Sequence, residues 1–456
     1  MSALPASYLT ATETIFLVRA GKLTITEIAE AHLARYDERD SVIHAWAYFD
    51  REYILREAKR LDAIPESERG PLYGAVLGIK DVIDTKDMPT QHGCPIYQDH
   101  RPNVDGGPVG IARAAGALLI GKTHTTEFAA SHVGTPARNA YDQDRTPGGS
   151  SSGSGAAVAD WQCHVAFGTQ TAGSTIRPGS YNGIFSMKPT WGAIGRDGCK
   201  ILSVTLDTVG FFARSIADIQ LFAQVFGLTD DIHSPSPPKP LSACTFAYVK
   251  TDQWIAGSGP SPELERAWSK SRQLLLDAGA TIKDVELPPE FDNVAPRNRK
   301  IMAAEGRVNF LPEYMTGKDK LDPLIVSFVE NRTNISRREQ LDIYDAMAAL
   351  RPKLDAIARQ YDAIVTPSVP GEAWLGTESG DSRMCSLWTT LHLPTVQIPG
   401  FASKNGMPIG LTLAAPRYED MRLLSVASEV AKVWVHADEE LLRKIPAPEA
   451  ARHCIP

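Results

Sequence analysis

Short apolar runs alternate with helix-like segments along nearly the whole chain, and this alternation constrains the fold more than any other feature. Residues 75–80 and 117–120 have the composition of buried strands, with a short helix predicted at 109–115 between them. Residues 245–249 and 281–287 are again strand-like and flank a predicted helix. Strands and helices that alternate over such a length predict one mixed α/β domain rather than several independent ones.

Within that single domain, residues 1–456, the segments differ in character. The N-terminal segment is predicted to be helical, because Thr24 and Glu27 form a capping box ahead of apolar residues at helical spacing. Residues 233–240, rich in Pro and Ser, are interpreted as a linker or an extended surface excursion. We expect N-terminal helices over 1–65, a core with the candidate site over 66–225, a part completing the sheet and the pocket over 244–436, and a tail over 437–456.

Composition excludes several classes of protein. The 456 residues include 47 Lys plus Arg against 54 Asp plus Glu, a net charge of −7, so the basic surface typical of a nucleic-acid binder is not expected. A hydrophobic share of 43% is enough for a large core and argues against disorder. No run of 18 apolar residues and no basic-then-apolar leader occurs, so we expect neither a membrane span nor a signal peptide.

The six cysteines are scattered, and even the two nearest, Cys163 and Cys199, lie 36 residues apart. Without a CxxC pair, neither a zinc ribbon nor a redox dithiol is encoded, and no metal site is predicted. Free thiols of this kind are typical of a reducing compartment. We therefore expect a cytoplasmic protein.

One motif match fails on its context. Residues 116–123 satisfy the phosphate-loop pattern GxxxxGK[ST] at every position. That pattern binds phosphate only when a strand precedes the loop and a helix follows it. Here a helix precedes Gly116 and the interior of the match is strand-like, so we predict a helix stop that leads into a buried strand.

A second match concerns Ser151, the central residue of Gly149-Ser150-Ser151-Ser152-Gly153, which fits the nucleophile-elbow pattern GxSxG. An elbow needs a strand before the serine and a histidine late in the chain. Residues 141–147 make a poor strand, and none of the late histidines has a flanking pattern that recommends it. Ser151 is kept as an alternative nucleophile.

The remaining motifs occur in a specific order. Lys80 ends a buried strand, residues 148–153 form a Gly-Gly-Ser-Ser-Ser-Gly loop, and residues 168–178 read Gly-Thr-Gln-Thr-Ala-Gly-Ser-Thr-Ile-Arg-Pro. This combination resembles the amidase signature family, and most similar is its malonamidase-like branch. The resemblance implies a single large α/β domain whose central mixed, twisted β-sheet is covered by helices on both faces. It also implies hydrolysis of amides by a Ser–cis-Ser–Lys triad, with no cofactor.

Carried over residue by residue, the resemblance makes Ser174 the nucleophile, Ser150 the bridging acid and base, and Lys80 the terminal base. The Gly149–Ser150 peptide bond would be cis. A free lysine titrates near about 10.4 and is a poor base at neutral pH. Burial at a strand end disfavours the ammonium and lowers that pKa, so a neutral Lys80 could accept the proton of Ser150, which in turn deprotonates Ser174.

The run Thr171-Ala172-Gly173 before the nucleophile resembles the family's oxyanion hole, in which backbone N–H groups stabilise the tetrahedral intermediate. Ala172 departs from the family, where glycine is usual. If that position needs a positive φ, an alanine there is strained.

Three further residues receive expected roles. Arg177 has two interpretations: its guanidinium either holds a substrate carboxylate, as the malonamidase resemblance implies, or braces the loop. Ser151, if it is not the nucleophile, is expected to donate a hydrogen bond to the relay. Asp207 is expected to anchor a loop.

Alternative functions remain open. The expected substrate is a small amide, and an ester or carbamate would suit the same chemistry. A related amidotransferase A-type subunit would release ammonia from glutamine within a partner complex, but Gln170 stands where that subunit usually has Asp. The resemblance is compatible with a homodimer, and the substrate pocket is expected from residues 90–145 and 290–390.

Overall fold

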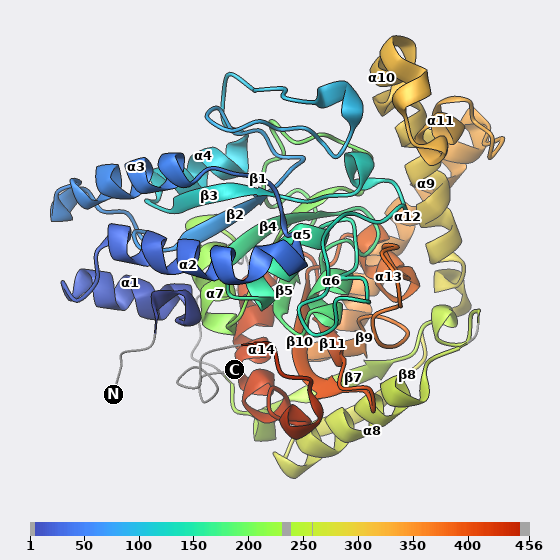
Figure 1. Ribbon diagram of the computed structural model, residues 1–456. Helices are drawn as coiled ribbons and strands as arrows, with labels where there is room; N and C mark the ends of the chain where they lie inside the picture. Colours follow the sequence, from blue (N-terminus) through green and yellow to red (C-terminus); the bar gives the residue numbers. More distant parts are fainter. Residues whose placement is uncertain (1–4, 230–238, 258, 447–456) are drawn as a thin grey trace.

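A single mixed β-sheet forms the centre of the protein in the computed structural model, which describes residues 5–229, 239–257 and 259–446 (Figure 1). The strand order is β1-β3-β2-β4-β6-β5-β10-β11-β9-β7-β8. The strands are β1 (Trp46–Phe49), β2 (Val76–Lys80), β3 (Leu118–Thr123), β4 (Val165–Gln170), β5 (Phe185–Lys188), β6 (Thr208–Ala213), β7 (Thr245–Val249), β8 (Thr281–Val285), β9 (Ala363–Pro367), β10 (Thr395–Ala402) and β11 (Pro408–Ala414).

Two parallel groups lie in this sheet, with antiparallel pairs between them. Strand β2 runs parallel to both β3 and β4, and β7 runs parallel to both β8 and β9. The pairs that join these groups through β6, β5, β10 and β11 are antiparallel. The expected mixed sheet is therefore confirmed, and so is the predicted β7-helix-β8 unit.

Helices cover both faces of the sheet (Figure 1). This is why central strands such as β2, β4 and β10 are buried at every residue, as sheets covered on both faces require. The helices are α1 (Ala11–Arg19), α2 (Ile25–Ile43), α3 (Arg51–Asp62), α4 (Gly107–Ala114), α5 (Ser152–Ala159), α6 (Ile176–Tyr181), α7 (Ile216–Val225), α8 (Pro262–Asp277), α9 (Val294–Asn309), α10 (Leu311–Gly317), α11 (Pro323–Val329), α12 (Arg337–Ala358), α13 (Arg383–Thr390) and α14 (Asp420–Trp434).

The predicted helix boundaries have the expected caps. Thr24 accepts from the backbone N–H of Glu27, and the Glu27 carboxylate accepts from the N–H of Thr24, which completes the capping box of α2. Ser261 caps α8 in the same way through the N–H of Leu264. Gly279 follows the end of α8 with φ +86°, a conformation that glycine adopts at no steric cost.

Two sequence expectations are corrected. The first 65 residues are not only helical, because β1 (Trp46–Phe49) pairs antiparallel with β3 at the edge of the sheet. The sequence also predicts that the helix opened by Ser336 and Glu339 is kinked or interrupted at Pro352, whereas α12 continues through this residue. Its Met347, Leu350 and Leu354 pack in a hydrophobic cluster, and this burial compensates for the one backbone hydrogen bond that proline cannot make.

The phosphate-loop match is a strand, as predicted. Gly116 has φ +94° just after α4, and residues 118–123 are β3, fully buried. Lys122 is thus a strand residue. The sequence around it has no helix N-terminus to hold a phosphate.

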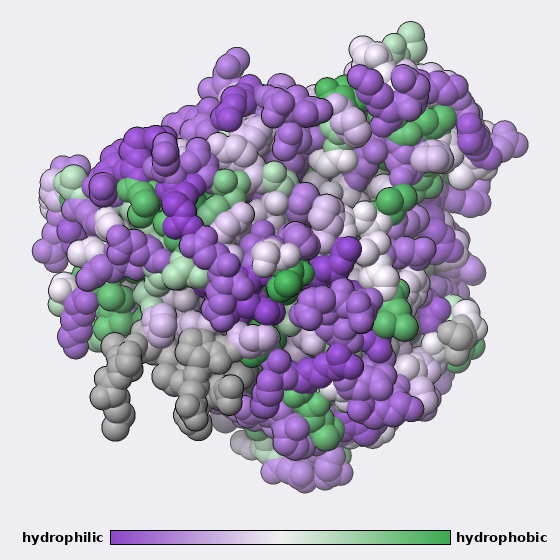
Figure 2. All heavy atoms as spheres, viewed as in Figure 1, coloured by the Kyte–Doolittle hydropathy of each residue, from purple (hydrophilic) through white to green (hydrophobic). Residues whose placement is uncertain are grey.

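The surface and the ends of the chain complete the description. The face in Figure 2 is mostly hydrophilic, with hydrophobic residues in small separate patches. Within the described ranges, none of the helices combines the length and apolar composition needed to cross a bilayer. Residues 233–238 of the Pro-rich segment and 447–456 of the tail lie outside the described residues.

Candidate active site

The candidate residues gather where two neighbouring parallel strands end. Leu77 of β2 pairs with Val165 of β4, so the carboxyl ends of the two strands lie at the same edge of the sheet. Lys80 is the last residue of β2, and the nucleophile loop follows directly after β4. This register explains how Lys80 can meet Thr169, which lies 89 positions away in the sequence.

Lys80 is fully buried and surrounded by hydroxyl and carbonyl oxygens. Its Nζ lies 2.8 Å from Ser150 Oγ, 2.8 Å from Thr169 Oγ1 and 3.5 Å from the Thr169 carbonyl oxygen. Burial lowers the pKa of Lys80 well below its usual value, and the more distant negative charge of Asp207 offsets this only in part. The structure therefore brings Lys80 and Ser150 together as predicted and adds Thr169.

Neutral Lys80 matches these neighbours in hydrogen-bonding capacity. An uncharged amine has two N–H donors and one lone pair. The Thr169 hydroxyl and carbonyl oxygens can accept the two donors, and the lone pair is then left for the hydroxyl proton of Ser150. This arrangement can remove a proton from Ser150.

The loop that carries Ser150 is held by Arg177. The Gly149–Ser150 peptide bond is cis, as the resemblance implied, and the Gly149 carbonyl accepts from Nε of Arg177 at 3.0 Å and also from its Nη2. Nη1 of Arg177 donates to the Gly380 carbonyl at 2.6 Å. Arg177 is 4% exposed, and all three of its nitrogens are engaged with backbone oxygens.

Ser174 lies in the turn between β4 and α6 and differs from the other serines here. Its side-chain oxygen forms no hydrogen bond with any residue that the structure describes. The Ser150 hydroxyl contacts Lys80, and the Ser151 hydroxyl contacts backbone. Ser174 thus has an uncommitted hydroxyl.

Each of the three carbonyl groups before Ser174 is held by a hydrogen bond. The carbonyl of Thr171 accepts from Asn298 Nδ2 at 3.1 Å, that of Ala172 from Thr389 Oγ1 at 2.7 Å, and that of Gly173 from the Arg177 N–H at 2.9 Å. In a planar trans peptide the next N–H points away from the carbonyl.

It follows that the N–H groups of Ala172, Gly173 and Ser174 point away from these partners. Among the described residues, none of the three donates to another group. Free backbone N–H groups beside a nucleophile can stabilise an oxygen anion. Ala172 does not have a positive φ, so the suspected strain at this alanine is absent.

Ser151 has the surroundings of a structural residue. It is fully buried, and its Oγ lies 3.4 Å from both the N–H and the carbonyl oxygen of Thr169. No strand precedes it in residues 141–147, where the structure has turns and an isolated bridge at Arg145. Ser151 therefore lacks the geometry of a nucleophile elbow. It reaches Lys80 only through the Thr169 backbone.

Asp207 has the contacts of a loop anchor. Its Oδ1 accepts from the Thr171 hydroxyl at 2.6 Å, and its Oδ2 accepts from the N–H groups of Leu202 and Ser203. Burial raises the pKa of Asp207 to about 6. The carboxylate ties the start of the nucleophile loop to residues 202–203.

Sequence reasoning missed four contributors to this site: Thr169, Gln170 as a helix cap, Asn298 and Thr389. Gln170 was noted only for its departure from a related amidotransferase, yet its Oε1 accepts from the N–H groups of Thr175 and Ile176 at the start of α6. Thr169 could have been found from its place near the end of a strand beside β2. Asn298 and Thr389 come from α9 and α13, where no motif marks them.

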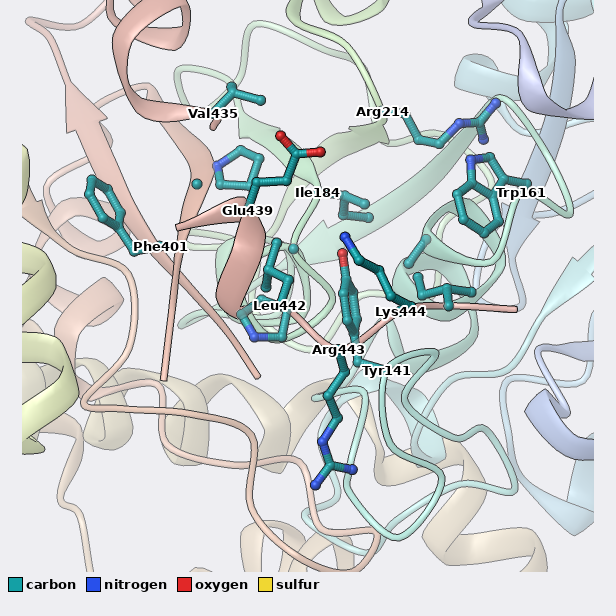
Figure 3. Close-up of a pocket in the computed structure, with 16 residues that line it drawn as sticks. Tyr141, Trp161, Ile184, Arg214, Phe401, Val435, Glu439, Leu442, Arg443 and Lys444 are labelled. Atoms are coloured by element: carbon teal, nitrogen blue, oxygen red, sulfur yellow. The ribbon is translucent and has the colours of Figure 1, made fainter. Parts of the chain in front are cut away.

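A separate pocket lies beneath the C-terminal segment (Figure 3). It is lined by Tyr141, Trp161 and Arg214 together with residues such as Leu442 and Lys444. Lys80, Ser150 and Ser174 are not among its lining residues, so this pocket is distinct from the candidate site.

Comparisons with known proteins show the family to which the chain belongs. The model of the Amidase family matches residues 27–424. The A-type subunit of the glutamyl-tRNA(Gln) amidotransferase of Salinispora tropica is 30% identical, over 93% of this chain and 96% of that protein. A crystal structure of an amidase is 26% identical with a TM-score of 0.82, over 93% of this chain and 99% of that one.

A further likeness supports the fold alone. The peptide amidase from Stenotrophomonas maltophilia is 24% identical with a TM-score of 0.79, over 98% of this chain and 99% of that one. The likeness to the malonamidase-like branch stays a prediction. Because the family model covers most of the chain, the protein belongs to the amidase family and is an amidohydrolase.

Proposed function

We propose that the protein hydrolyses the C–N bond of a small carboxamide through an acyl-enzyme on Ser174, with Ser150 as bridging acid and base and Lys80 as terminal base. The observation that carries this proposal is the 2.8 Å contact between the fully buried Lys80 Nζ and Ser150 Oγ. No carboxylate forms an ion pair with Lys80 in the part of the chain that the structure describes. Its neutral form is therefore favoured, as a base requires.

The reaction proceeds in two halves. Lys80 takes the proton of Ser150, Ser150 takes that of Ser174, and Ser174 Oγ attacks the amide carbon. The N–H groups of Ala172, Gly173 and Ser174 stabilise the resulting oxyanion. When the C–N bond breaks, the relay returns a proton to the departing amine. The same relay then deprotonates a water, which attacks the ester and frees Ser174 and the carboxylate product.

Arg177 acts in this proposal as a brace for the Ser150 loop rather than as a receptor for a substrate carboxylate. Its nitrogens are engaged with the carbonyls of Gly149 and Gly380, which leaves the guanidinium poorly placed to form a bidentate pair. Arg177→Ala is then expected to lower kcat/KM for acidic and neutral amides by the same factor. A loss confined to acidic amides, as a rise in KM, would establish the carboxylate-binding role instead.

A second candidate function has support from the comparisons. The relative from Salinispora tropica is named as the A-type subunit of a glutamyl-tRNA(Gln) amidotransferase. If this chain worked in that way, it would hydrolyse glutamine only with partner subunits. Gln170 in place of the usual Asp favours the stand-alone amidase. Amide hydrolysis by the purified chain alone distinguishes the two, and esters and carbamates belong in the same substrate screen.

The test of the proposed mechanism is labelling with a small fluorophosphonate, followed by mass-spectrometric mapping. The expected result is a single adduct on Ser174 that is lost in Lys80→Ala. Ser151→Ala is the matched control and should retain the adduct, because Ser151 contacts only backbone. An adduct on Ser151, or labelling of Ser174 that persists without Lys80, would contradict the proposal.

A further inference from the structure

The nucleophile loop owes its shape to two helices that are remote in sequence. Asn298 of α9 donates to the Thr171 carbonyl at 3.1 Å, and Thr389 of α13 donates to the Ala172 carbonyl at 2.7 Å. Asn298 is fully buried and Thr389 is 1% exposed. Both therefore act on the loop in surroundings where water is not available as a substitute partner.

The direction of each hydrogen bond at Thr389 can be derived. Two backbone N–H groups donate to one side-chain atom of Gln170, so that atom is the amide oxygen and the other is the NH₂ group. The NH₂ group can only donate, and it lies 2.9 Å from Thr389 Oγ1. The Thr389 hydroxyl accepts there, and two carbonyls lie within reach of its single proton: that of Ala172 at 2.7 Å and that of Cys385, one turn back in α13, at 3.2 Å. The shorter contact favours donation to the Ala172 carbonyl.

Gln170 and Thr389 thus connect the two ends of the nucleophile turn. The Gln170 oxygen holds the first N–H groups of α6, after Ser174. Through Thr389, the NH₂ group of Gln170 also holds the Ala172–Gly173 peptide group, which precedes Ser174. The Ala172 carbonyl and the Gly173 N–H belong to one planar peptide group, so fixing the carbonyl fixes the direction of the N–H.

We propose that Thr389 is a positioning residue for catalysis, which holds the Gly173 N–H toward the oxyanion, with Asn298 doing the same for the Ala172 N–H. This inference rests on the proposed function. Thr389 does not touch the reacting atoms in this scheme. It acts by preventing the Ala172–Gly173 peptide group from rotating, because a preorganised donor needs no reorganisation when charge develops.

The decisive variant is Thr389→Val, which keeps the side-chain shape and removes the hydroxyl. Loss of one oxyanion donor lowers kcat by about 10²-fold to 10³-fold, and loss of its support is expected to lower kcat by about tenfold or more. KM should stay within about twofold, because the donor acts mainly in the transition state. Thr389→Ser, which restores the hydroxyl, should restore kcat.

The matched control is Ser386→Ala on the same helix. Within the described residues the Ser386 hydroxyl donates to the Ser382 carbonyl alone, so its removal disturbs α13 without removing a hydrogen bond to the nucleophile loop. Asn298→Leu removes the hydrogen bond to the Thr171 carbonyl and so tests the Thr171–Ala172 peptide group. It replaces Thr389→Val as the test if that variant fails to fold. The rate of fluorophosphonate labelling at Ser174 gives a second readout, which should fall in parallel with kcat.

The outcomes separate this inference from the proposed function. A wild-type protein that neither hydrolyses amides nor labels at Ser174 would contradict the proposed function. An active wild-type protein whose Thr389→Val variant keeps its kcat and labelling rate would overturn only the role of Thr389. The role is likewise overturned if the variant changes the thermal midpoint or KM alone.

Discussion

Two buried lysines at adjacent strand positions have opposite surroundings. Lys80 ends β2, and Lys122 lies on the neighbouring β3, where it pairs with Ile79. Both side chains are 0% exposed. Lys122 lies 3.4 Å from the Asp81 carboxylate and donates to the Ile83 carbonyl at 2.8 Å and to the hydroxyls of Thr85 and Thr90. Among the described residues, Lys80 forms hydrogen bonds with Ser150 and Thr169 and has no carboxylate partner.

The difference between these two lysines is the counter-ion and not the degree of burial. Burial lowers the pKa of both lysines, but only Lys122 has an adjacent carboxylate that favours its charged form. Lys122 therefore serves as a buried cation that ties β3 to residues 81–85. Lys80, with hydroxyls in place of a carboxylate, is poised to exchange a proton.

The largest expected effect follows the removal of the proton acceptor. Lys80→Ala should lower kcat by about 10³-fold to 10⁴-fold, the upper part of the range for a lost general base. Lys80→Arg should be equally inactive, because a guanidinium stays protonated. Steady-state kinetics on any amide accepted by the wild-type protein measures this effect. An active Lys80→Arg variant would contradict the contrast with Lys122, because a permanent cation at position 80 would then be enough for catalysis.

Removal of the counter-ion should damage stability rather than chemistry. Asp81→Asn leaves Lys122 buried as a cation without its carboxylate, and the expected loss in free energy of unfolding is about 3–5 kcal/mol. Replacing both residues, as Asp81→Asn with Lys122→Met, should recover part of that loss. Urea unfolding of the two variants tests this, and equal stability of the single and double variants would show that the ion pair is not what Asp81 supplies.

The pH dependence of activity should identify Lys80 by its sign. The reactive form is the neutral amine, so kcat/KM should fall about tenfold per pH unit as the pH drops below the depressed pKa of Lys80. The negative charge of Asp207 raises that pKa, so Asp207→Asn should move the acid limb to lower pH. A limb that moves to higher pH in this variant would indicate a different titrating group.

Local sequence motifs predicted the reactive residues of the site but not the residues that hold them in place. Lys80, Ser150 and Ser174 belong to short motifs, and the structure brings Lys80 and Ser150 together as predicted, whereas the role of Ser174 stays a prediction. Strand β1 was missed because four edge residues between two helices, one buried and three partly exposed, give little periodic signal. Asn298 and Thr389 act on carbonyls 127 and 217 positions away, and such contacts depend on how α9 and α13 pack rather than on any local pattern.

The smallest expected effect is that of Thr169→Val, which removes the hydroxyl that lies beside Lys80 where a counter-ion lies beside Lys122. Thr169→Val removes the acceptor at 2.8 Å but keeps the backbone carbonyl at 3.5 Å, so Lys80 remains buried and neutral. Its lone pair is then less firmly directed at Ser150, and kcat should fall by about tenfold, within the usual effect of a misoriented base. Thr169→Ser should be nearly wild type in kcat.

Thr169→Asp sharpens the comparison further, because it would give Lys80 the kind of partner that Lys122 has. The resulting ion pair should hold Lys80 protonated and abolish activity at neutral pH, whereas an active Thr169→Asp variant would mean that a counter-ion does not govern the role of a buried lysine here.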